Sequence, residues 1–225
     1  EGIRHCCHKP LKLIKKEKIN ICHCHGFLGG FLGLLLKIFT QTPYLITIQS
    51  ADFDVYHPKA GGITTYIHDS LEKKIFQEAA KRHTVSTFLQ KSYESRGIKD
   101  SVLIPNGVEL DKFEPLTDKQ KARKELGFDV QHLFICVSRL EHKNGTHDLI
   151  KALNYLDPDI KDFKLIICGD GSDRKKLERL TKKLKLEDRV EFLGSVLRSD
   201  SPKYLGSADI FIRPSLAEGF GIVFL

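Results

Sequence analysis

Short apolar runs alternate with amphipathic segments along almost the whole chain. Eight of these runs are rich in β-branched residues and are predicted to be strands, at residues 19–25, 44–49, 83–87, 101–104, 133–138, 164–168, 190–193 and 209–213. The segments between them have helical spacing. Strands that alternate with single helices form parallel sheets covered on both faces. The pattern therefore predicts an α/β protein of the doubly wound type.

The clearest helical pattern covers residues 172–184. Leu177, Leu180 and Leu184 recur at a spacing that places them on one apolar stripe, and lysines occupy the remaining faces. Ser172 is the predicted N-cap of this helix.

The pattern breaks at residues 106–117, where Pro and Gly signal turns and no clean period is found. Four β/α units lie on each side of this break. We therefore predict two doubly wound, Rossmann-like lobes, residues 1–108 and residues 109–225. Sheets of this kind bind ligands at the carboxyl ends of their strands, so a shared ligand is expected in the cleft between the lobes.

The charge balance narrows the class of partner only slightly. The chain has 36 basic and 29 acidic residues, a net charge of +7 that suits phosphate-bearing ligands or an anionic membrane surface. Lysines are densest in residues 9–18, where a solvated helix face is the more ordinary interpretation. The longest apolar stretch, residues 26–39, contains Lys37 and is too short to span a bilayer, so we expect a buried helix there.

The six cysteines do not predict a metal site. The sequences HCCH at 5–8 and CHCH at 22–25 raise the alternative of zinc. On a strand, however, the cysteines and histidines of 22–25 would point to opposite faces, whereas structural zinc sites use spacings such as C-x2-C. Cys136 and Cys168 lie in apolar strands and are expected in the core. Without a disulfide framework, a reducing cytoplasm is expected.

The first candidate site follows the strand at 133–138. Arg139 ends that strand, Lys143 lies in the next loop, and Gly145 opens a helix. Two cations at a helix N-terminus suit a diphosphate. Ordinary surface side chains are the alternative interpretation.

A second turn, Gly169-Asp170-Gly171, follows the strand at 164–168. Arg174 stands where a dinucleotide fingerprint has its third glycine, which counts against a nicotinamide or flavin site. A tight turn explains the two glycines as well as ligand contact does.

The third candidate site is the turn after the last strand, where Glu218 precedes Gly219, Phe220 and Gly221. Glycines let a ligand approach the backbone, whose N–H groups suit an anion. A carboxylate beside them is suited to hydroxyl groups next to a phosphate.

With these sites assembled, the chain resembles the family 4 glycosyltransferases, which are retaining enzymes of the GT-B fold. The resemblance runs over nearly the whole length and rests on five segments in the family's order. They are IPNGVELDKFEP at 104–115, SRLEHKNG at 138–145, GDGSDRKKLE at 169–178, RVEFLGSV at 189–196 and PSLAEGFG at 214–221.

The resemblance implies roles for individual residues. Arg139 and Lys143 would hold the donor diphosphate, Glu218 would be the first glutamate of the Glu-x7-Glu motif, and His25 matches the N-lobe His-x-His segment. These four are the predicted catalytic residues. The predicted nucleotide-sugar-binding residues are Gly169, Gly171, Val196, Gly219, Phe220 and Gly221.

The chain departs from the family pattern at several positions. Asn144 directly precedes the glycine where many members have the lysine, and Gln49 stands where many have a histidine. The chain begins with Glu, contains no Met, and ends one residue before the second glutamate of the motif would fall. We therefore expect both lobes to be incomplete, and residues 1–225 alone to be inactive.

The resemblance implies a hexosyltransferase that moves a sugar, with retention, from a UDP- or GDP-sugar to a hydroxyl acceptor such as a glycan or a lipid-linked saccharide. Neither a metal nor a cofactor is expected. The expected location is the cytoplasm, with a peripheral contact on the inner face of the membrane, and no nucleic acid is expected as a partner. The alternatives are a non-catalytic nucleotide-sugar-binding relative and a nucleotide-sugar epimerase of the same fold.

Overall fold

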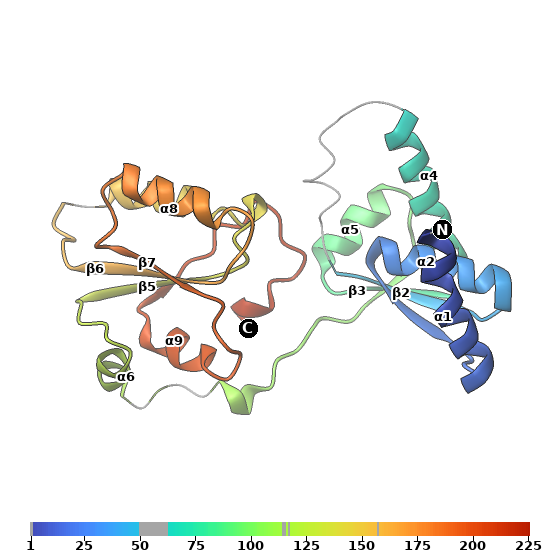
Figure 1. The fold of residues 1–225 in the computed structure, drawn as a ribbon, viewed down its shortest axis with the longest axis horizontal. Helices are drawn as coiled ribbons and strands as arrows, with labels where there is room; N and C mark the ends of the chain where they lie inside the picture. Colours follow the sequence, from blue (N-terminus) through green and yellow to red (C-terminus); the bar gives the residue numbers. More distant parts are fainter. Residues whose placement is uncertain (1, 50–62, 114–115, 117, 157) are drawn as a thin grey trace. The chain divides into compact units, whose positions relative to one another are not determined.

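The structure is a computed structural model of the chain, and it describes residues 2–49, 63–113, 116, 118–156 and 158–225. It contains two four-stranded parallel sheets (Figure 1). The first has the order β1 (Cys22–His25), β2 (Tyr44–Ile48), β3 (Lys81–Thr84), β4 (Ser101–Leu103). The second has the order β7 (Val190–Gly194), β6 (Phe163–Cys168), β5 (His132–Val137), β8 (Ile210–Phe211). The predicted α/β class and all eight predicted strands are confirmed.

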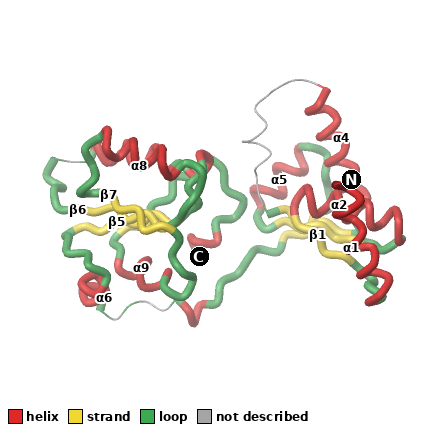
Figure 2. Tube along the Cα trace, in the orientation of Figure 1, coloured by secondary structure: helices red, strands yellow, loops and turns green. Residues whose placement is uncertain are grey.

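The chain forms two compact units, which are described separately. The first comprises Glu1–Gly107 together with Glu218–Leu225, and the second comprises Val108–Ala217. Figure 2 shows that each unit has its own sheet surrounded by helices and loops. The assignment of residues 1–108 and 109–225 to the two lobes of an enzyme stays a prediction.

The hydrophobic cluster of the first unit lies on one face of its sheet. Its helices are α1 (Gly2–Glu17), α2 (Gly26–Thr40), α4 (Ile63–Glu78) and α5 (Thr87–Ser95). Alternate residues of β2, Tyr44, Ile46 and Ile48, pack with Leu34 of α2 and Leu89 of α5. These residues form the hydrophobic cluster that the structure describes in the first unit.

The boundary between β3 and α5 differs from the prediction. A strand was expected over residues 83–87, but β3 ends at Thr84. The reason is Ser86, which caps α5 by accepting a hydrogen bond from the Leu89 N–H at 3.2 Å. A capping serine satisfies a donor that the helix cannot satisfy itself, and this ends the strand.

The sheet of the second unit is covered on both faces. Its helices are α6 (Lys119–Glu125), α7 (Thr146–Ala152), α8 (Arg174–Lys183) and α9 (Ser201–Ser207). The cluster on one face includes side chains of α7 and α8, and the cluster on the other includes side chains of α9. Figure 1 shows α8 on one side of the strands and α9 on the other.

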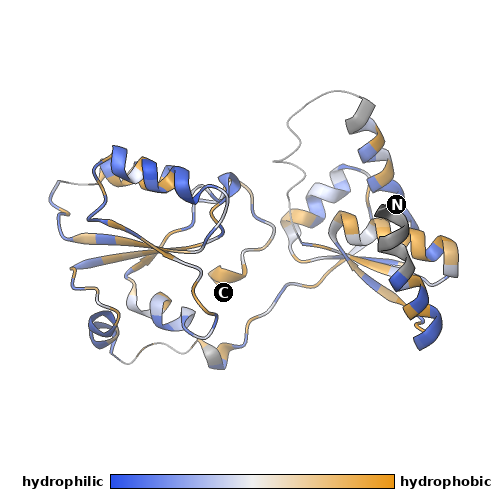
Figure 3. Cartoon of the chain, in the orientation of Figure 1, coloured by the Kyte–Doolittle hydropathy of each residue, from blue (hydrophilic) through white to orange (hydrophobic). Residues whose placement is uncertain are grey.

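The predicted amphipathic helix at residues 172–184 is found as α8. Leu177, Leu180 and Leu184 all join the same hydrophobic cluster, as predicted. In Figure 3 its ribbon is mainly hydrophilic, with hydrophobic residues interspersed. The predicted N-cap is wrong, because the cap position is Asp173 rather than Ser172. The Asp173 N–H donates to the Leu140 carbonyl at 2.9 Å, which fixes the chain before the first helical residue.

β8 has two residues, and a single carboxylate holds it in place. A strand over residues 209–213 was predicted, but only Ile210 and Phe211 pair with β5. Asp209 accepts hydrogen bonds from the Leu133 N–H and the Lys119 ammonium, each at 2.8 Å, and from Arg123. Burial alone would raise the pKa of Asp209, but these donors outweigh it and lower the pKa to about 2.

Among the described residues, no helix combines the length and the apolar character that a bilayer crossing requires.

Candidate functional site

The strand order of the second unit places a topological switch point between β5 and β8. The chain starts at β5 and adds β6 and then β7 on one side of it. It then returns and adds β8 on the other side of β5. In open parallel sheets, ligands bind beyond the carboxyl ends of the strands at such a point. The two segments that leave this point are the loop at residues 138–145 and the segment at residues 212–217.

The loop after β5 brings two predicted site residues together on one carboxylate. Arg139 Nη1 lies 3.3 Å from Glu141 Oε1, and Lys143 Nζ lies 3.9 Å from Glu141 Oε2. The Lys143 side chain is 11% exposed, whereas that of Arg139 is 71% exposed. Sequence reasoning missed Glu141, although its place between the two cations in the chain was a usable signal. The three side chains leave one net positive charge at the switch point.

Asn144 and Gly145 have structural roles in this loop. Asn144, which stands where many family members have the lysine, donates from Nδ2 to the Arg139 carbonyl at 2.5 Å and closes the loop. Gly145 has a φ of +68°, and a Cβ there would lie 1.9 Å from the Pro214 carbonyl oxygen. Only glycine fits such a close approach of two backbones. The loop after β5 therefore contacts the segment after β8.

Hydrogen bonds hold the same two segments together. The Lys143 carbonyl accepts from the Leu216 N–H at 2.8 Å and from the Ala217 N–H at 3.4 Å. The backbone that carries Lys143 is therefore fixed to the residues that directly precede Glu218 in the chain.

The two glycines of the turn after β6 are explained by backbone packing. Gly169 has a φ of +146°, and a Cβ there would lie 1.9 Å from the Ser138 carbonyl oxygen. A Cβ at Gly171 would lie 2.5 Å from the Leu140 carbonyl oxygen. The tight-turn interpretation is therefore sufficient for both residues, and their contact with a nucleotide sugar stays a prediction.

Arg174, at the position of the missing third glycine, fastens this turn. Its guanidinium lies 3.1 Å from Asp170 Oδ2 and 2.9 Å from Glu178 Oε1. The Gly171 N–H bond, followed by the Arg174 bond, lowers the pKa of Asp170. Val196 lies in the loop after β7, where its partly buried side chain packs against the cluster that contains Leu133. Its contact with the nucleotide sugar also stays a prediction.

The segment from Glu218 onward belongs to the first unit. The Gly219 carbonyl accepts a hydrogen bond from the Ser86 hydroxyl at 2.6 Å, and Phe220 packs against the core cluster of that unit. Gly221 has a φ of +69°, and a three-residue 3-10 helix, Ile222–Phe224, follows it. Glu218 is thus described with the first unit, and Arg139 and Lys143 with the second. Their combination in one donor site stays a prediction.

His25 is the last residue of β1 and is exposed. Its ring centroid lies 4.3 Å from that of His23. Cys24 is buried in the core, so the cysteines and histidines of this strand alternate between faces as expected. His23 in turn joins a hydrogen-bonded row with Thr47 and His83 that sequence reasoning missed.

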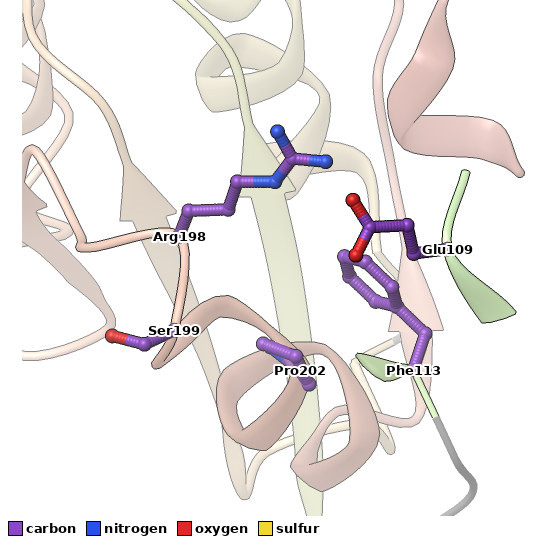
Figure 4. A pocket seen from close by; sticks show the side chains of 5 residues that line it. All are labelled: Glu109, Phe113, Arg198, Ser199 and Pro202. Carbon is purple, nitrogen blue, oxygen red and sulfur yellow. The ribbon is translucent and has the colours of Figure 1, made fainter. Parts of the chain in front are cut away.

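A pocket of about 470 Å³ lies elsewhere in the second unit. Its lining residues are Glu109, Phe113, Arg198, Ser199 and Pro202. In Figure 4 the guanidinium of Arg198 and the carboxylate of Glu109 point toward one another above the ring of Phe113. One cation and one anion give this lining no net preference for a phosphate. None of the predicted site residues lines it. Across the described part of the chain, no group of three or more His, Cys, Asp or Glu side chains could hold a metal ion.

Two family descriptions match the chain, one for each half. Residues 6–112 match the family described as Glycosyltransferase Family 4. Residues 118–225 match the family described as Glycosyl transferases group 1.

The similar proteins include named glycosyltransferases. An uncharacterized glycosyltransferase of Methanocaldococcus jannaschii is 31% identical over 96% of this chain and 57% of its own length. The alpha-monoglucosyldiacylglycerol synthase of Streptococcus pneumoniae is 26% identical over 96% of this chain and 51% of its own length. The crystal structure of Anabaena HepE in complex with UDP and glucose has a TM-score of 0.79 at 22% identity, over 96% of this chain and 58% of HepE.

The likeness to HepE establishes the fold, which is that of GT-B lobes. The chain spans about half the length of the curated relatives it matches. The two family matches together cover nearly all of residues 1–225. The similarity to the Methanocaldococcus jannaschii glycosyltransferase likewise covers 96% of the chain. The chain therefore belongs to glycosyltransferase family 4.

Proposed function

We propose that the protein transfers a hexose from a nucleotide-diphosphate donor to a hydroxyl acceptor, with retention at the anomeric carbon. The observation that carries the proposal is the arrangement of Arg139 and Lys143 around Glu141, in the loop at the β5–β8 switch point. This loop offers two cations where a parallel sheet of this order accepts its ligand.

The chemistry of sugar transfer needs those charges. Breaking the anomeric C–O bond builds negative charge on the leaving diphosphate, and fixed cations stabilise it in the transition state. A cation about 4 Å from a phosphate contributes roughly 4 kcal/mol at an effective dielectric constant near 20. Removing that contribution from the transition state would slow turnover about a thousandfold. Arg139 and Lys143 are therefore sufficient in kind to act without a metal ion.

The remaining roles follow the family motif. Glu218 would contact the donor sugar, and the backbone of Gly219–Gly221 would lie near the sugar and the phosphates. His25, at the carboxyl end of β1, would lie on the acceptor side. The leaving phosphate would help to deprotonate the acceptor hydroxyl, as expected for transfer with retention.

The comparisons agree with a UDP-sugar donor and a lipid acceptor, and the proposal also includes a GDP-sugar donor and a glycan acceptor. HepE was solved with UDP and glucose, and the pneumococcal relative is named a monoglucosyldiacylglycerol synthase. A peripheral contact with an anionic membrane would agree with the lysine-rich helix α1.

Nucleotide binding is the first test. Isothermal titration calorimetry of residues 1–225 with UDP and with GDP is expected to show binding of at least one of them. Charge-assisted hydrogen bonds contribute about 1.5–3 kcal/mol each, so Arg139→Ala and Lys143→Ala should each weaken that binding about 10- to 100-fold. Arg179→Ala is the matched control, because Arg179 lies on the exposed side of α8. Equal affinities for all variants would overturn the site assignment.

Product analysis separates the alternatives. Incubation of the full-length protein with UDP- and GDP-hexoses and an acceptor mixture, followed by mass spectrometry, should yield a glycosylated product whose formation persists in a chelator. Interconversion of the donor sugar would indicate an epimerase, and donor binding without turnover in a chain extended at both ends would indicate a non-catalytic relative. Loss of transfer in the chelator, restored by Mg²⁺, would contradict metal independence.

A further inference from the structure

A row of hydrogen-bonded side chains crosses the first sheet on the face opposite its core. We call it the histidine row, and its members are His23 of β1, Thr47 of β2 and His83 of β3. His23 Nε2 lies 2.6 Å from Thr47 Oγ1, and Thr47 Oγ1 lies 2.9 Å from His83 Nδ1. The row ends at the Ile104 carbonyl, 2.8 Å from His83 Nε2. Thr47 and His83 each lie one residue before the carboxyl end of their strand, and Ile104 directly follows β4. His23 lies nearer the start of β1, but its neighbour His25 is the last residue of that strand, at the edge where parallel sheets bind ligands.

The Ile104 carbonyl determines the direction of every hydrogen bond in the row. A carbonyl oxygen can only accept, so His83 Nε2 carries a proton. In neutral imidazole the other nitrogen then accepts, so the Thr47 hydroxyl donates to His83 Nδ1. Thr47 is 1% exposed, which keeps water from its hydroxyl. Having donated its single proton, that hydroxyl accepts from His23 Nε2.

The row therefore holds His23 in the tautomer whose Nδ1 is an acceptor. Burial, followed by the nearby charges of His25 and His83, lowers the pKa of His23, which favours the neutral ring. The titratable groups on this face of β1 and β3 are His23, His25, Lys81 and His83, as strand alternation places them, and β2 and β4 contribute none. The exposed ring of His25 lies beside that of His23.

We infer that Thr47 and His83 are positioning residues that hold the His23 ring as a hydrogen-bond acceptor, and that His23 and His25 together bind a hydroxyl group of a sugar. A neutral imidazole acceptor recognises an alcohol O–H. A ring nitrogen held as an acceptor suits an alcohol better than an anion, because an anion has no proton to donate to it. The inference rests on the proposed function, because a sugar hydroxyl is the acceptor class of that reaction.

Protonation of His83 would reverse the row. Both nitrogens of His83 would then donate, so the Thr47 hydroxyl would become free to donate to His23 Nε2, which would make His23 Nδ1 a donor. The hydrogen-bonding character of His23 thus depends on a ring two strands away.

The tautomers can be measured directly by long-range ¹H–¹⁵N NMR spectra of residues 1–225. Both His23 and His83 should carry their proton on Nε2 at pH 8. This measurement needs no variant, and finding His23 with its proton on Nδ1 would overturn the inference. Thr47→Val removes the bridging hydroxyl at nearly constant volume and should leave His23 as a mixture of tautomers, whereas Thr47→Ser should restore the single form. Thr181→Val is the matched control, because Thr181 is a buried threonine of α8.

Hydroxyl binding is tested with methyl α-D-glucopyranoside and methyl α-D-mannopyranoside as probes. One of them should shift the ring resonances of His23 and His25, and Thr47→Val should weaken that binding at least fivefold while Thr47→Ser retains it. If neither glycoside shifts these rings, hydroxyl binding by the pair is refuted. UDP or GDP binding to the second unit should be unchanged in Thr47→Val. Failure of nucleotide binding in the wild-type chain would instead count against the proposed function.

Discussion

Asp209 is the residue that fixes the short strand β8 to the second sheet. Its carboxylate receives the Leu133 N–H, the Lys119 ammonium and the guanidinium of Arg123, which is 2% exposed. A strand with two paired residues has few ladder hydrogen bonds of its own. The Asp209 carboxylate therefore neutralises a buried cation, and its hydrogen bonds supplement the few ladder bonds of the short strand.

Asp209→Asn is expected to destabilise the second unit by about 2–3 kcal/mol at pH 7, because it removes that charge and leaves Arg123 without its counter-ion. The pKa of Asp209 is about 2 in the folded chain, below the usual value near 3.9. Its contribution to the free energy of unfolding is thus complete above about pH 4 and disappears as the pH falls through about 2. Urea unfolding followed by circular dichroism at several pH values should show the difference from wild type shrinking over that window.

The control for this prediction is Glu125→Gln, which breaks the exposed ion pair with Lys203. Exposed ion pairs contribute little to stability, so Glu125→Gln should lower the free energy of unfolding much less than Asp209→Asn does. A difference between wild type and Asp209→Asn that is independent of pH would contradict the electrostatic explanation.

A substitution at Gly169 tests whether this glycine is needed for backbone packing or for contact with a ligand. Gly169→Ala would place a Cβ 1.9 Å from the Ser138 carbonyl oxygen at a φ of +146°, so we expect a loss of roughly 2–4 kcal/mol without any ligand present. Thermal unfolding measures this loss. Gly107→Ala is the control, because a Cβ there would meet no atom within 4 Å. An unchanged melting temperature for Gly169→Ala would indicate that the glycine serves the ligand alone.

At the scale of elements, the hydrophobic pattern was enough to predict all eight strands and the stripe of α8. The ends of these elements depended on single hydrogen bonds that the pattern does not contain. Ser86 caps α5 and ends β3 early, and the bond from Asp173 to the Leu140 carbonyl moves the start of α8 by one residue. Both bonds involve backbone groups, which the apolar pattern does not register.

The residues of the candidate site also fall into those that the sequence could predict and those that it could not. Arg139 and Lys143 could be predicted because they lie close together in the chain after one strand. The histidine row could not, because its members are 24 and 36 residues apart and meet only through strand order and register. Side chains that are close in the sequence can be predicted to act together, whereas side chains on different strands can be grouped only once the strand order and register are known.

Ser86 has two functions that a pair of variants can separate. Its hydroxyl caps α5 and donates to the Gly219 carbonyl. Ser86→Ala should cost about 1 kcal/mol through the lost cap. Ser86→Asp keeps a capping acceptor but has no proton to donate, so α5 should stay intact while the backbone amides of residues 218–225 exchange faster with solvent.

Hydrogen exchange read by mass spectrometry measures both effects. Asp118→Ala is the control, because Asp118 caps α6 of the second unit through the Lys121 N–H, whereas residues 218–225 belong to the first. If Ser86→Asp leaves the exchange of residues 218–225 unchanged, the Gly219 bond does not hold that segment.

At the scale of the whole molecule, the family and the two compact units predict where a nucleotide acts. The cations proposed to hold the diphosphate lie in the second unit. A ligand that binds only the folded form stabilises it by about 2.7 kcal/mol at one hundred times its dissociation constant. Amides in β5 and β6 should therefore exchange about 100-fold more slowly at that concentration of UDP or GDP, whichever binds, and the exchange of amides in β2 should not change.

Arg139→Ala at the same nucleotide concentration should retain only about 1 kcal/mol of this stabilisation, because weaker binding leaves the site partly empty. Equal slowing in both sheets would contradict the proposal that the charged contacts to the diphosphate lie in the second unit, and no slowing in either would contradict nucleotide binding altogether.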